Sequence, residues 1–226
     1  MYQAILFDID GTLIDHSSSQ RDALREFQSS IMPDASFDDF HKEWKRLGKF
    51  YFDKYADGEV TLNGQRICRI REVLGKDGAG ISDEEALGLF ERYIETYKKY
   101  WRPYPDVKPV LECLKDRFSL GVISNGDSRD QREKLYSTGI ATYFKAIVIS
   151  EDIGMAKPNP LIFSHALEIL GIGAHEAVYV GDDIKADIEG ARNAGMLDVY
   201  IDRDSTGYMD ASVRIEDLYG LMDILI

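Results

Sequence analysis

The first residues able to do chemistry are two aspartates that directly follow an apolar run near the N-terminus. Residues 4–7 are all apolar, and they lead into the pattern Asp-x-Asp-Gly-Thr at residues 8–12. Such a run is typical of a strand buried on both faces, and alternation along it would place Asp8 and Asp10 on the same side. Two carboxylates held together are electrostatically costly unless a cation joins them. The pattern therefore predicts a metal ion, with one aspartate attacking phosphorus and the other moving a proton. The alternative is a pair of ordinary strand-end or turn aspartates.

A second polar group follows the apolar run at residues 119–124, which is predicted to be a strand. Its last residue begins the sequence Ser124-Asn125-Gly126. A hydroxyl and backbone N–H groups at such a turn can hold a phosphoryl oxygen. The same three residues are also common in ordinary turns, so the segment alone leaves both interpretations open.

A lysine follows the next predicted strand, at residues 146–150. Lys157 lies in the sequence Ala-Lys-Pro, just before a predicted helix. Its ammonium group could neutralise charge on a transferring phosphoryl group and balance Asp8. Most surface lysines are merely solvated, so without its context this residue is better interpreted as a solvated surface lysine.

Three more aspartates follow the predicted strand at residues 177–180. Asp182 and Asp183 come directly after it, and Asp187 lies in the next predicted helix. Hard oxygen ligands at a strand end suit Mg²⁺, so Asp182 and Asp183 are candidate ligands. Asp183 is also well placed to cap the helix N-terminus. Asp187 could instead orient Lys157 or a metal-bound water.

The elements that would position these residues fall into two regions. From about residue 104 onward, short β-branched runs alternate with helical patterns, which predicts right-handed βαβ units and a parallel sheet. Residues 16–102 carry helical patterns only, at 18–30, 36–56, 60–75 and 82–100. The predicted fold class is α/β: a Rossmann-like parallel-sheet core made of residues 1–15 and 103–226, with an inserted all-α cap domain.

Composition narrows the class of partner. The 226 residues include 27 basic and 40 acidic side chains, a net charge of −13, and such a balance argues against nucleic acid or anionic membrane as a partner. The chain shows no leader-like segment and no apolar run of membrane-spanning length. Cys68 and Cys113 lie far apart and are predicted to be buried free thiols, which favours a reduced cytoplasmic setting. Whether the protein is a monomer or a homodimer stays open.

The four motifs together carry a family resemblance. In chain order they are Asp-x-Asp-Gly-Thr, Ser-Asn-Gly, Ala-Lys-Pro and Gly-Asp-Asp with a later Asp. This series resembles the haloacid dehalogenase superfamily of aspartyl-nucleophile hydrolases, over the whole chain and with a helical cap inserted after the first motif. The resemblance implies that Asp8 is the nucleophile and Asp10 the general acid/base. It also implies that Ser124 and Lys157 bind the phosphoryl group, and that Mg²⁺ is held by Asp8, the backbone carbonyl of Asp10, and Asp182.

The second aspartate of the first motif, Asp10, helps to distinguish phosphatases from dehalogenases within that superfamily. Dehalogenase members usually lack it, because a departing halide needs no proton. The presence of Asp10 therefore favours a Mg²⁺-dependent phosphatase that hydrolyses a small phosphomonoester through an aspartyl-phosphate. A 2-haloacid dehalogenase and a non-catalytic binding protein are the weaker alternatives.

Substrate choice is expected to depend on the cap and on residues near the motifs. Thr12, His16, Asn125 and Gly126 are candidate substrate-binding residues beside Ser124 and Lys157. The aromatic residues between 44 and 55 are predicted to form mainly the core of the cap, with a minority able to stack on a base. Residues 51–74 loosely resemble caps of the pyrimidine 5′-nucleotidase-like branch. Nucleoside monophosphates are therefore the first substrate hypothesis, with sugar phosphates and phosphoglycolate as alternatives.

Overall fold

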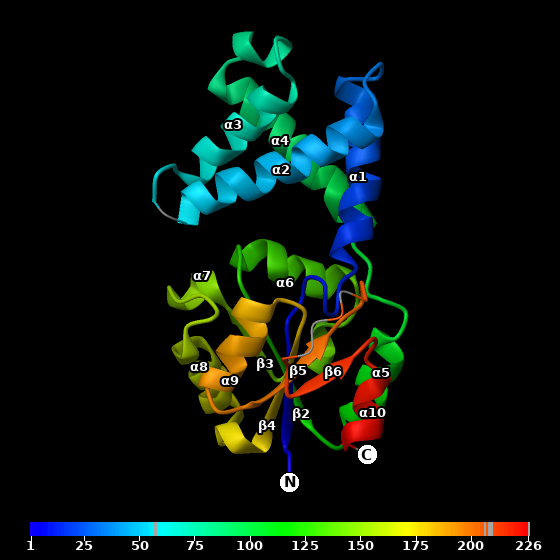
Figure 1. Ribbon diagram of the computed structural model, residues 1–226, viewed down its shortest axis with the longest axis vertical. Helices are drawn as coiled ribbons and strands as arrows, with labels where there is room; N and C mark the ends of the chain where they lie inside the picture. Colours follow the sequence, from blue (N-terminus) through cyan, green and yellow to red (C-terminus); the bar gives the residue numbers. More distant parts are fainter. Residues whose placement is uncertain (57, 206, 208–209, 226) are drawn as a thin grey trace. The chain divides into compact units, whose positions relative to one another are not determined.

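The computed structural model describes residues 1–56, 58–205, 207 and 210–225; Asp57, in the segment that resembles the nucleotidase branch, lies outside them. The chain divides into two compact units (Figure 1). The first consists of Met1–His16 and Trp101–Ile226, and the second of Ser17–Tyr100. The predicted boundaries placed residues 16, 101 and 102 with the helical region, whereas the structure groups them with the sheet.

The first unit contains a six-stranded sheet in the order β3-β2-β1-β4-β5-β6, with every pair parallel. Phe7 lies opposite both Val122 and Val180, so β1 is flanked by β2 and β4. The carboxyl ends of these three strands meet at one edge of the sheet, which is where open α/β sheets bind ligands. The prediction of an α/β fold with a parallel sheet is confirmed. The strands are β1 (Ala4–Phe7), β2 (Ser119–Ser124), β3 (Ala146–Ile149), β4 (Ala177–Gly181), β5 (Leu197–Ile201) and β6 (Val213–Ile215).

Alternate residues of β1 belong to two separate cores, one on each face of the sheet. Ile5 and Phe7 pack in the cluster that includes α5, whereas Ala4 and Leu6 pack in the cluster that includes α8. All four are fully buried, as expected for a strand covered on both faces. The helices of this unit are α5 (Val107–Leu114), α6 (Ser128–Ser137), α7 (Ser150–Ile153), α8 (Pro160–Leu170), α9 (Gly190–Asn193) and α10 (Gly220–Leu225), with 3₁₀ turns η2 (Ala141–Tyr143) and η3 (Ala174–Glu176) and the π-helical turn η4 (Ile184–Glu189).

Two features of this unit differ from the sequence-based expectations. Strand β6 was not predicted, because it has three residues and Arg214 at its centre is exposed, which leaves no apolar run to find. Cys113 was expected to be buried but is exposed, because the buried face of α5 is made by Val107, Val110, Leu111 and Leu114 instead. Cys68 is half-buried, and both thiols are free.

The second unit is entirely helical within its described residues. Its four α-helices start and end within two residues of the predicted positions. The N-terminus of α4 has a capping box: the Ser82 N–H donates to Glu85 Oε2 (2.8 Å), and the Glu85 N–H donates to Ser82 Oγ (3.2 Å). The helices are α1 (His16–Ile31, whose first residue belongs to the first unit), α2 (Phe37–Ala56), α3 (Leu62–Val73) and α4 (Asp83–Tyr100), with the 3₁₀ turn η1 (Asp77–Gly80).

An aromatic cluster forms the core of the helical unit. The indole of Trp44 lies 4.6 Å from the ring of Tyr93 and 6.2 Å from that of Phe90, measured between centroids. The prediction that aromatics from 44 to 55 are mainly core is wrong for three of the five, because Phe50, Phe52 and Tyr55 are exposed. No helix among the described residues is both long and apolar enough to cross a bilayer.

Candidate active site

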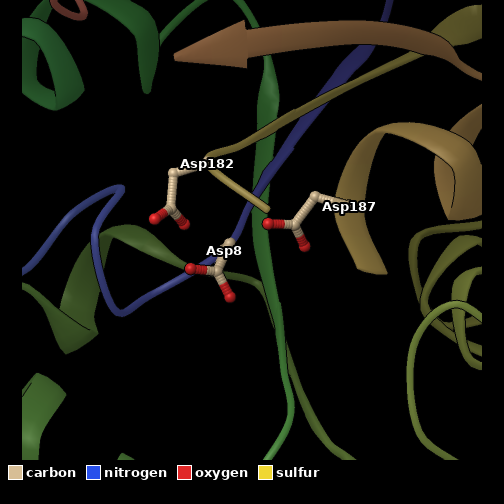
Figure 2. A group of neighbouring side chains, drawn as sticks. All are labelled: Asp8, Asp182 and Asp187. Carbon is tan, nitrogen blue, oxygen red and sulfur yellow. The ribbon is translucent and has the colours of Figure 1, made fainter. Parts of the chain in front are cut away.

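Three carboxylates meet at the carboxyl edge of the sheet. Asp8 follows β1, Asp182 follows the neighbouring β4, and Asp187 lies in the turn after it (Figure 2). One oxygen from each lies within 4.8 Å of the other two. Pairing of β1 with β4 brings the first two together, and one helical turn returns Asp187 to the group. This triad of hard oxygen donors can hold a divalent cation.

The ammonium group of Lys157 supplies positive charge beside these carboxylates. Its ammonium nitrogen lies 2.6 Å from Asp8 Oδ1, 2.6 Å from Asp187 Oδ1 and 3.0 Å from the hydroxyl of Tyr179. The lysine is only 6% exposed, so its charge depends on these partners. Sequence reasoning did not identify Tyr179. The available signal was a tyrosine inside an otherwise aliphatic buried strand, where its hydroxyl needs a polar partner.

The segment Ser124–Gly126 positions the lysine by hydrogen bonds within the protein. The Lys157 N–H donates to Asn125 Oδ1 (2.8 Å), and Asn125 Nδ2 donates to the Lys157 carbonyl (3.0 Å). The Gly126 N–H donates to Ser150 Oγ (3.0 Å). Ser124 is buried at the end of β2, and its hydroxyl lies 3.3 Å from the Asn125 carbonyl. The Asn125 amide and the Gly126 N–H, both predicted to bind substrate, therefore hold neighbouring loops together here.

Asp10 has a separate set of partners, on α6. Lys134 Nζ lies 2.6 Å and 2.7 Å from the two carboxylate oxygens, and Gln131 Nε2 donates to Asp10 Oδ2 (2.8 Å). Strand β1 ends at Phe7, so the alternation that would have aligned Asp10 with Asp8 stops before it. His16 Nδ1 lies 3.8 Å from Asp10 Oδ1. Lys134 and Gln131 were missed, although they lie three residues apart on one face of the helix that follows Ser-Asn-Gly.

The structure assigns different contacts to the two later aspartates. Asp183 Oδ1 accepts hydrogen bonds from the N–H groups of Lys185 (2.9 Å) and Ala186 (2.7 Å), so this side chain caps the following turn. The Asp183 N–H donates to Asp187 Oδ2 (3.0 Å), while Asp187 Oδ1 contacts Lys157. Asp187 lies in the triad, but both of its oxygens are engaged by protein groups.

The turn after β1 reaches Asp182 closely. Gly11 has a φ of +88°, and a Cβ at this position would lie 2.2 Å from Asp182 Oδ2. Glycine is therefore required both by the backbone conformation and by the space that the carboxylate occupies. Thr12 is fully buried, with Oγ1 3.5 Å from Asp182 Oδ1. Of the predicted substrate-binding residues, Thr12 thus lies beside the triad and His16 beside Asp10.

The surroundings of Asp8 and Asp182 raise the pKa values of these carboxyl groups, whereas the surroundings of Asp10 lower its pKa. Burial, only partly offset by Lys157, raises the pKa of Asp8 to about 7. Burial together with the charges of Asp8 and Asp187 raises the pKa of Asp182 to about 8. Burial also opposes the ionised form of Asp10, but Lys134, His16 and Gln131 together outweigh it and lower the pKa of Asp10 to about 2.

These shifts test whether the donor set fits a metal. Burial, together with the neighbouring carboxylates, raises the pKa values of Asp8 and Asp182 in the triad, and the charge of Lys157 offsets only part of this rise. A divalent cation among the same oxygens would supply the missing positive charge and keep the carboxylates ionised. The residues present therefore fit a hard divalent cation such as Mg²⁺.

Comparisons with known proteins show the family of this chain. A family model described as haloacid dehalogenase-like hydrolase matches residues 2–195. The chain is 35% identical over 223 residues to the glyceraldehyde 3-phosphate phosphatase of Methanopyrus kandleri, covering 96% of this chain and 90% of the relative. The chain therefore belongs to the haloacid dehalogenase-like hydrolase family. Within that family it is a phosphoric monoester hydrolase, as the whole-length match to a phosphatase shows.

Solved structures share the fold over the whole chain. The HAD-hydrolase YfnB of Bacillus subtilis, solved with magnesium bound, has a TM-score of 0.83 and 25% identity, covering 99% of this chain and 98% of that one. A 2-haloacid dehalogenase from Pseudomonas syringae pv. Tomato has a TM-score of 0.70 and 28% identity, covering 100% of this chain and 98% of that one. The fold alone therefore does not separate phosphoryl from halide chemistry, and the site residues must do so.

Proposed function

We propose that this chain hydrolyses a small phosphomonoester with Mg²⁺, through an aspartyl-phosphate on Asp8. The observation that carries the proposal is the division of partners between the two aspartates. Asp8 shares Lys157 with Asp187, another member of the triad, while Asp10 has its own cation, Lys134. One carboxylate is thus supported for attack on phosphorus and the other for proton transfer.

The proposed reaction has two halves. In the first, an oxygen of Asp8 bonds to phosphorus, the bond from phosphorus to the leaving oxygen breaks, and Asp10 gives that oxygen a proton. In the second, a water oxygen bonds to phosphorus, its proton goes to Asp10, and the bond to Asp8 breaks to release phosphate. Lys157 and Ser124, at the same edge of the sheet, stabilise the phosphoryl oxygens in both halves.

Mg²⁺ would be held by Asp8 and Asp182, with the backbone carbonyl of Asp10 that the family resemblance implies. When bound, it would neutralise phosphoryl oxygens and the carboxylates around them. Asp187 is within reach, but its contacts with Lys157 and the Asp183 N–H favour a supporting role. Asp183 caps a helical turn, so we propose that its carboxylate stays outside the ligand set. The magnesium in the YfnB structure supports the choice of ion.

The substrate is proposed to be a small sugar phosphate, of which glyceraldehyde 3-phosphate is the first example to test. The whole-length similarity to the phosphatase named for that ester supports this order. Nucleoside monophosphates, the first hypothesis from the sequence, and phosphoglycolate become the second arm of the test. A cytoplasmic location, in keeping with two free cysteines, is part of the same proposal.

A phosphate-release screen with Mg²⁺ tests these points. The substrates are glyceraldehyde 3-phosphate, hexose phosphates, phosphoglycolate and nucleoside monophosphates, each with and without EDTA. We expect phosphate release that EDTA abolishes, fastest with a sugar phosphate. A preference for nucleoside monophosphates would overturn the substrate assignment and leave the chemistry intact.

The dehalogenase alternative is tested in parallel with 2-chloropropionate in the absence of metal. Chloride release without phosphatase activity would overturn the proposed function. A folded protein that binds Mg²⁺ but is inert in both assays would instead support a non-catalytic binding protein.

A further inference from the structure

Lys134 is a buried lysine that none of the four motifs contains. It is 4% exposed, on α6, and its ammonium nitrogen lies within 2.7 Å of both carboxylate oxygens of Asp10. The same nitrogen lies 5.5 Å from the ring centroid of Trp101. Burying an ammonium group is costly unless a carboxylate compensates it, so this lysine and Asp10 must be considered as one unit.

Gln131 is the second residue of α6 that binds the Asp10 carboxylate. Its Nε2 donates to Asp10 Oδ2 (2.8 Å), and its Oε1 accepts a hydrogen bond from Lys134 (3.1 Å). The side chain is 6% exposed and also lies 3.3 Å from the Asn125 carbonyl through Nε2. Both oxygens of Asp10 are therefore engaged by donors from one helix, and each donor is fixed by another protein group.

We propose that Lys134 and Gln131 are positioning residues that hold Asp10 ready to accept a proton from water in the second half of the reaction. This inference rests on the proposed function of Asp10. The ammonium group of Lys134 contacts both oxygens of the Asp10 carboxylate, and the amide of Gln131 donates to one of them, so the carboxylate has a donor at each oxygen. The three hydrogen bonds also fix the direction of the carboxylate, and misplacement of a reacting group by about 1 Å can cost roughly 10²-fold in rate.

The two halves of the reaction depend differently on this positioning. In the second half, the water proton must reach Asp10 as the water oxygen bonds to phosphorus and the bond to Asp8 breaks. In the first half, a leaving group such as p-nitrophenolate departs without a proton. Loss of the Lys134 contact should therefore slow release of phosphate from Asp8 while sparing formation of the aspartyl-phosphate from p-nitrophenyl phosphate.

The test is rapid-mixing kinetics of Lys134→Met with p-nitrophenyl phosphate and Mg²⁺. We expect a burst of p-nitrophenolate close to one equivalent of enzyme, at a rate within about threefold of wild type, followed by a steady state slowed by about 10²-fold. With an alkyl phosphate, whose leaving group needs a proton, both phases should be slow. Lys145→Met is the matched control, since this exposed lysine of the same unit contacts Ser119 Oγ (3.2 Å) and its loss should leave the kinetics unchanged.

A double-mutant cycle separates positioning from general damage to the fold. In an Asp10→Asn background, Lys134→Met should change the steady-state rate by less than about threefold, because the group it positions is already gone. Gln131→Leu, which keeps the lysine, should give a smaller version of the same burst and serves if Lys134→Met fails to fold. Equal slowing of both phases, or slowing of the Asp10→Asn enzyme by the full factor, would overturn the inference alone. A wild type that releases phosphate from neither ester contradicts the proposed function and this inference with it.

Discussion

The two units differ in the groups that surround their buried positively charged side chains. In the sheet-containing unit, the buried ammonium groups of Lys157 and Lys134 lie within 2.7 Å of carboxylate oxygens. In the helical unit, the guanidinium groups of Arg66 and Arg69 each lie 5.3 Å from the ring centroid of Phe90. The Nε atoms of both arginines are buried and have no hydrogen-bond partner in the part of the chain that the structure describes.

This difference allows the stabilisation from charge pairs to be compared with the stabilisation from aromatic packing. Breaking a buried ion pair leaves an uncompensated charge and costs about 3–5 kcal/mol, whereas a cation over an aromatic ring contributes about 0.5–2 kcal/mol. Substitutions of buried cations should therefore have large effects in the first unit and small effects in the second. The core of the helical unit is its aromatic cluster.

Asp8→Asn should produce the largest effect on activity. The amide cannot attack phosphorus as a carboxylate does, so we expect the phosphate-release rate to fall by about 10⁴-fold or more. The urea midpoint of unfolding should be retained, because the change removes one of three crowded negative charges. A variant with near wild-type turnover would show that Asp8 is not the nucleophile.

Lys157→Met should produce the largest effect on stability. It leaves Asp8 and Asp187 without their ammonium partner, which should lower the free energy of unfolding by about 3–5 kcal/mol. Urea denaturation monitored by circular dichroism measures the change.

The matched control for Lys157→Met is Lys115→Met, which removes an exposed lysine paired with Glu112 and should change the free energy of unfolding by about 0.5 kcal/mol or less. Similar losses in the two variants would break the comparison, because buried and exposed charge pairs would then be equivalent.

Asp198 provides a test of whether charge pairing away from the triad stabilises the first unit. Burial opposes its ionised form, but Arg192 (3.1 Å) and two hydrogen bonds from Ser212 (2.6 and 2.8 Å) lower its pKa. Because the pKa is lower in the folded state, the stabilisation is complete above the unfolded pKa of about 3.9 and is lost as pH falls through the folded pKa. Asp198→Asn should therefore cost about 1–3 kcal/mol at pH 7 and less at pH 3.5.

Urea unfolding of wild type and Asp198→Asn at both pH values isolates this contribution, since all other titrating groups are shared. A difference in unfolding free energy that is the same at pH 7 and pH 3.5 would mean that the charge of Asp198 contributes nothing.

The sequence predicted the fold and the strand ends at which Asp8, Ser124 and Asp182 lie, because both depend on short-range patterns. The apolar run before Asp8 and the strand–helix alternation are local signals, and the carboxyl ends of parallel strands necessarily share one edge of a sheet. The partners of each side chain could not be predicted in the same way. The pairing of Asp10 with Lys134 depends on how the turn after β1 meets α6, 124 residues further along the chain.

The same limit applies to residues with two plausible roles. Asp183 could be a ligand or a cap from its position alone, and only the direction of its carboxylate toward the Lys185 and Ala186 N–H groups shows the capping contacts. Asn125 was predicted to bind substrate, yet its side-chain amide accepts a hydrogen bond from the Lys157 N–H and donates one to the Lys157 carbonyl. A turn motif specifies residue types, whereas the approach of a distant loop decides which atoms remain for a ligand.

Arg69→Met should produce the smallest effect and is the sharpest test of the helical unit. The guanidinium lies 4.8 Å from the Trp44 ring centroid, and burial lowers its pKa, so the charge gains from the rings but loses hydration. Methionine keeps apolar contact with the same rings, and we expect the free energy of unfolding to change by about 1 kcal/mol or less. Urea unfolding followed by tryptophan fluorescence measures it, with Arg66→Met as the matched variant and unchanged hydrolysis of p-nitrophenyl phosphate as the control. A loss near that of Lys157→Met would contradict the contrast between the units, because it would show that Arg69 is held by charge as strongly as the lysine among the aspartates.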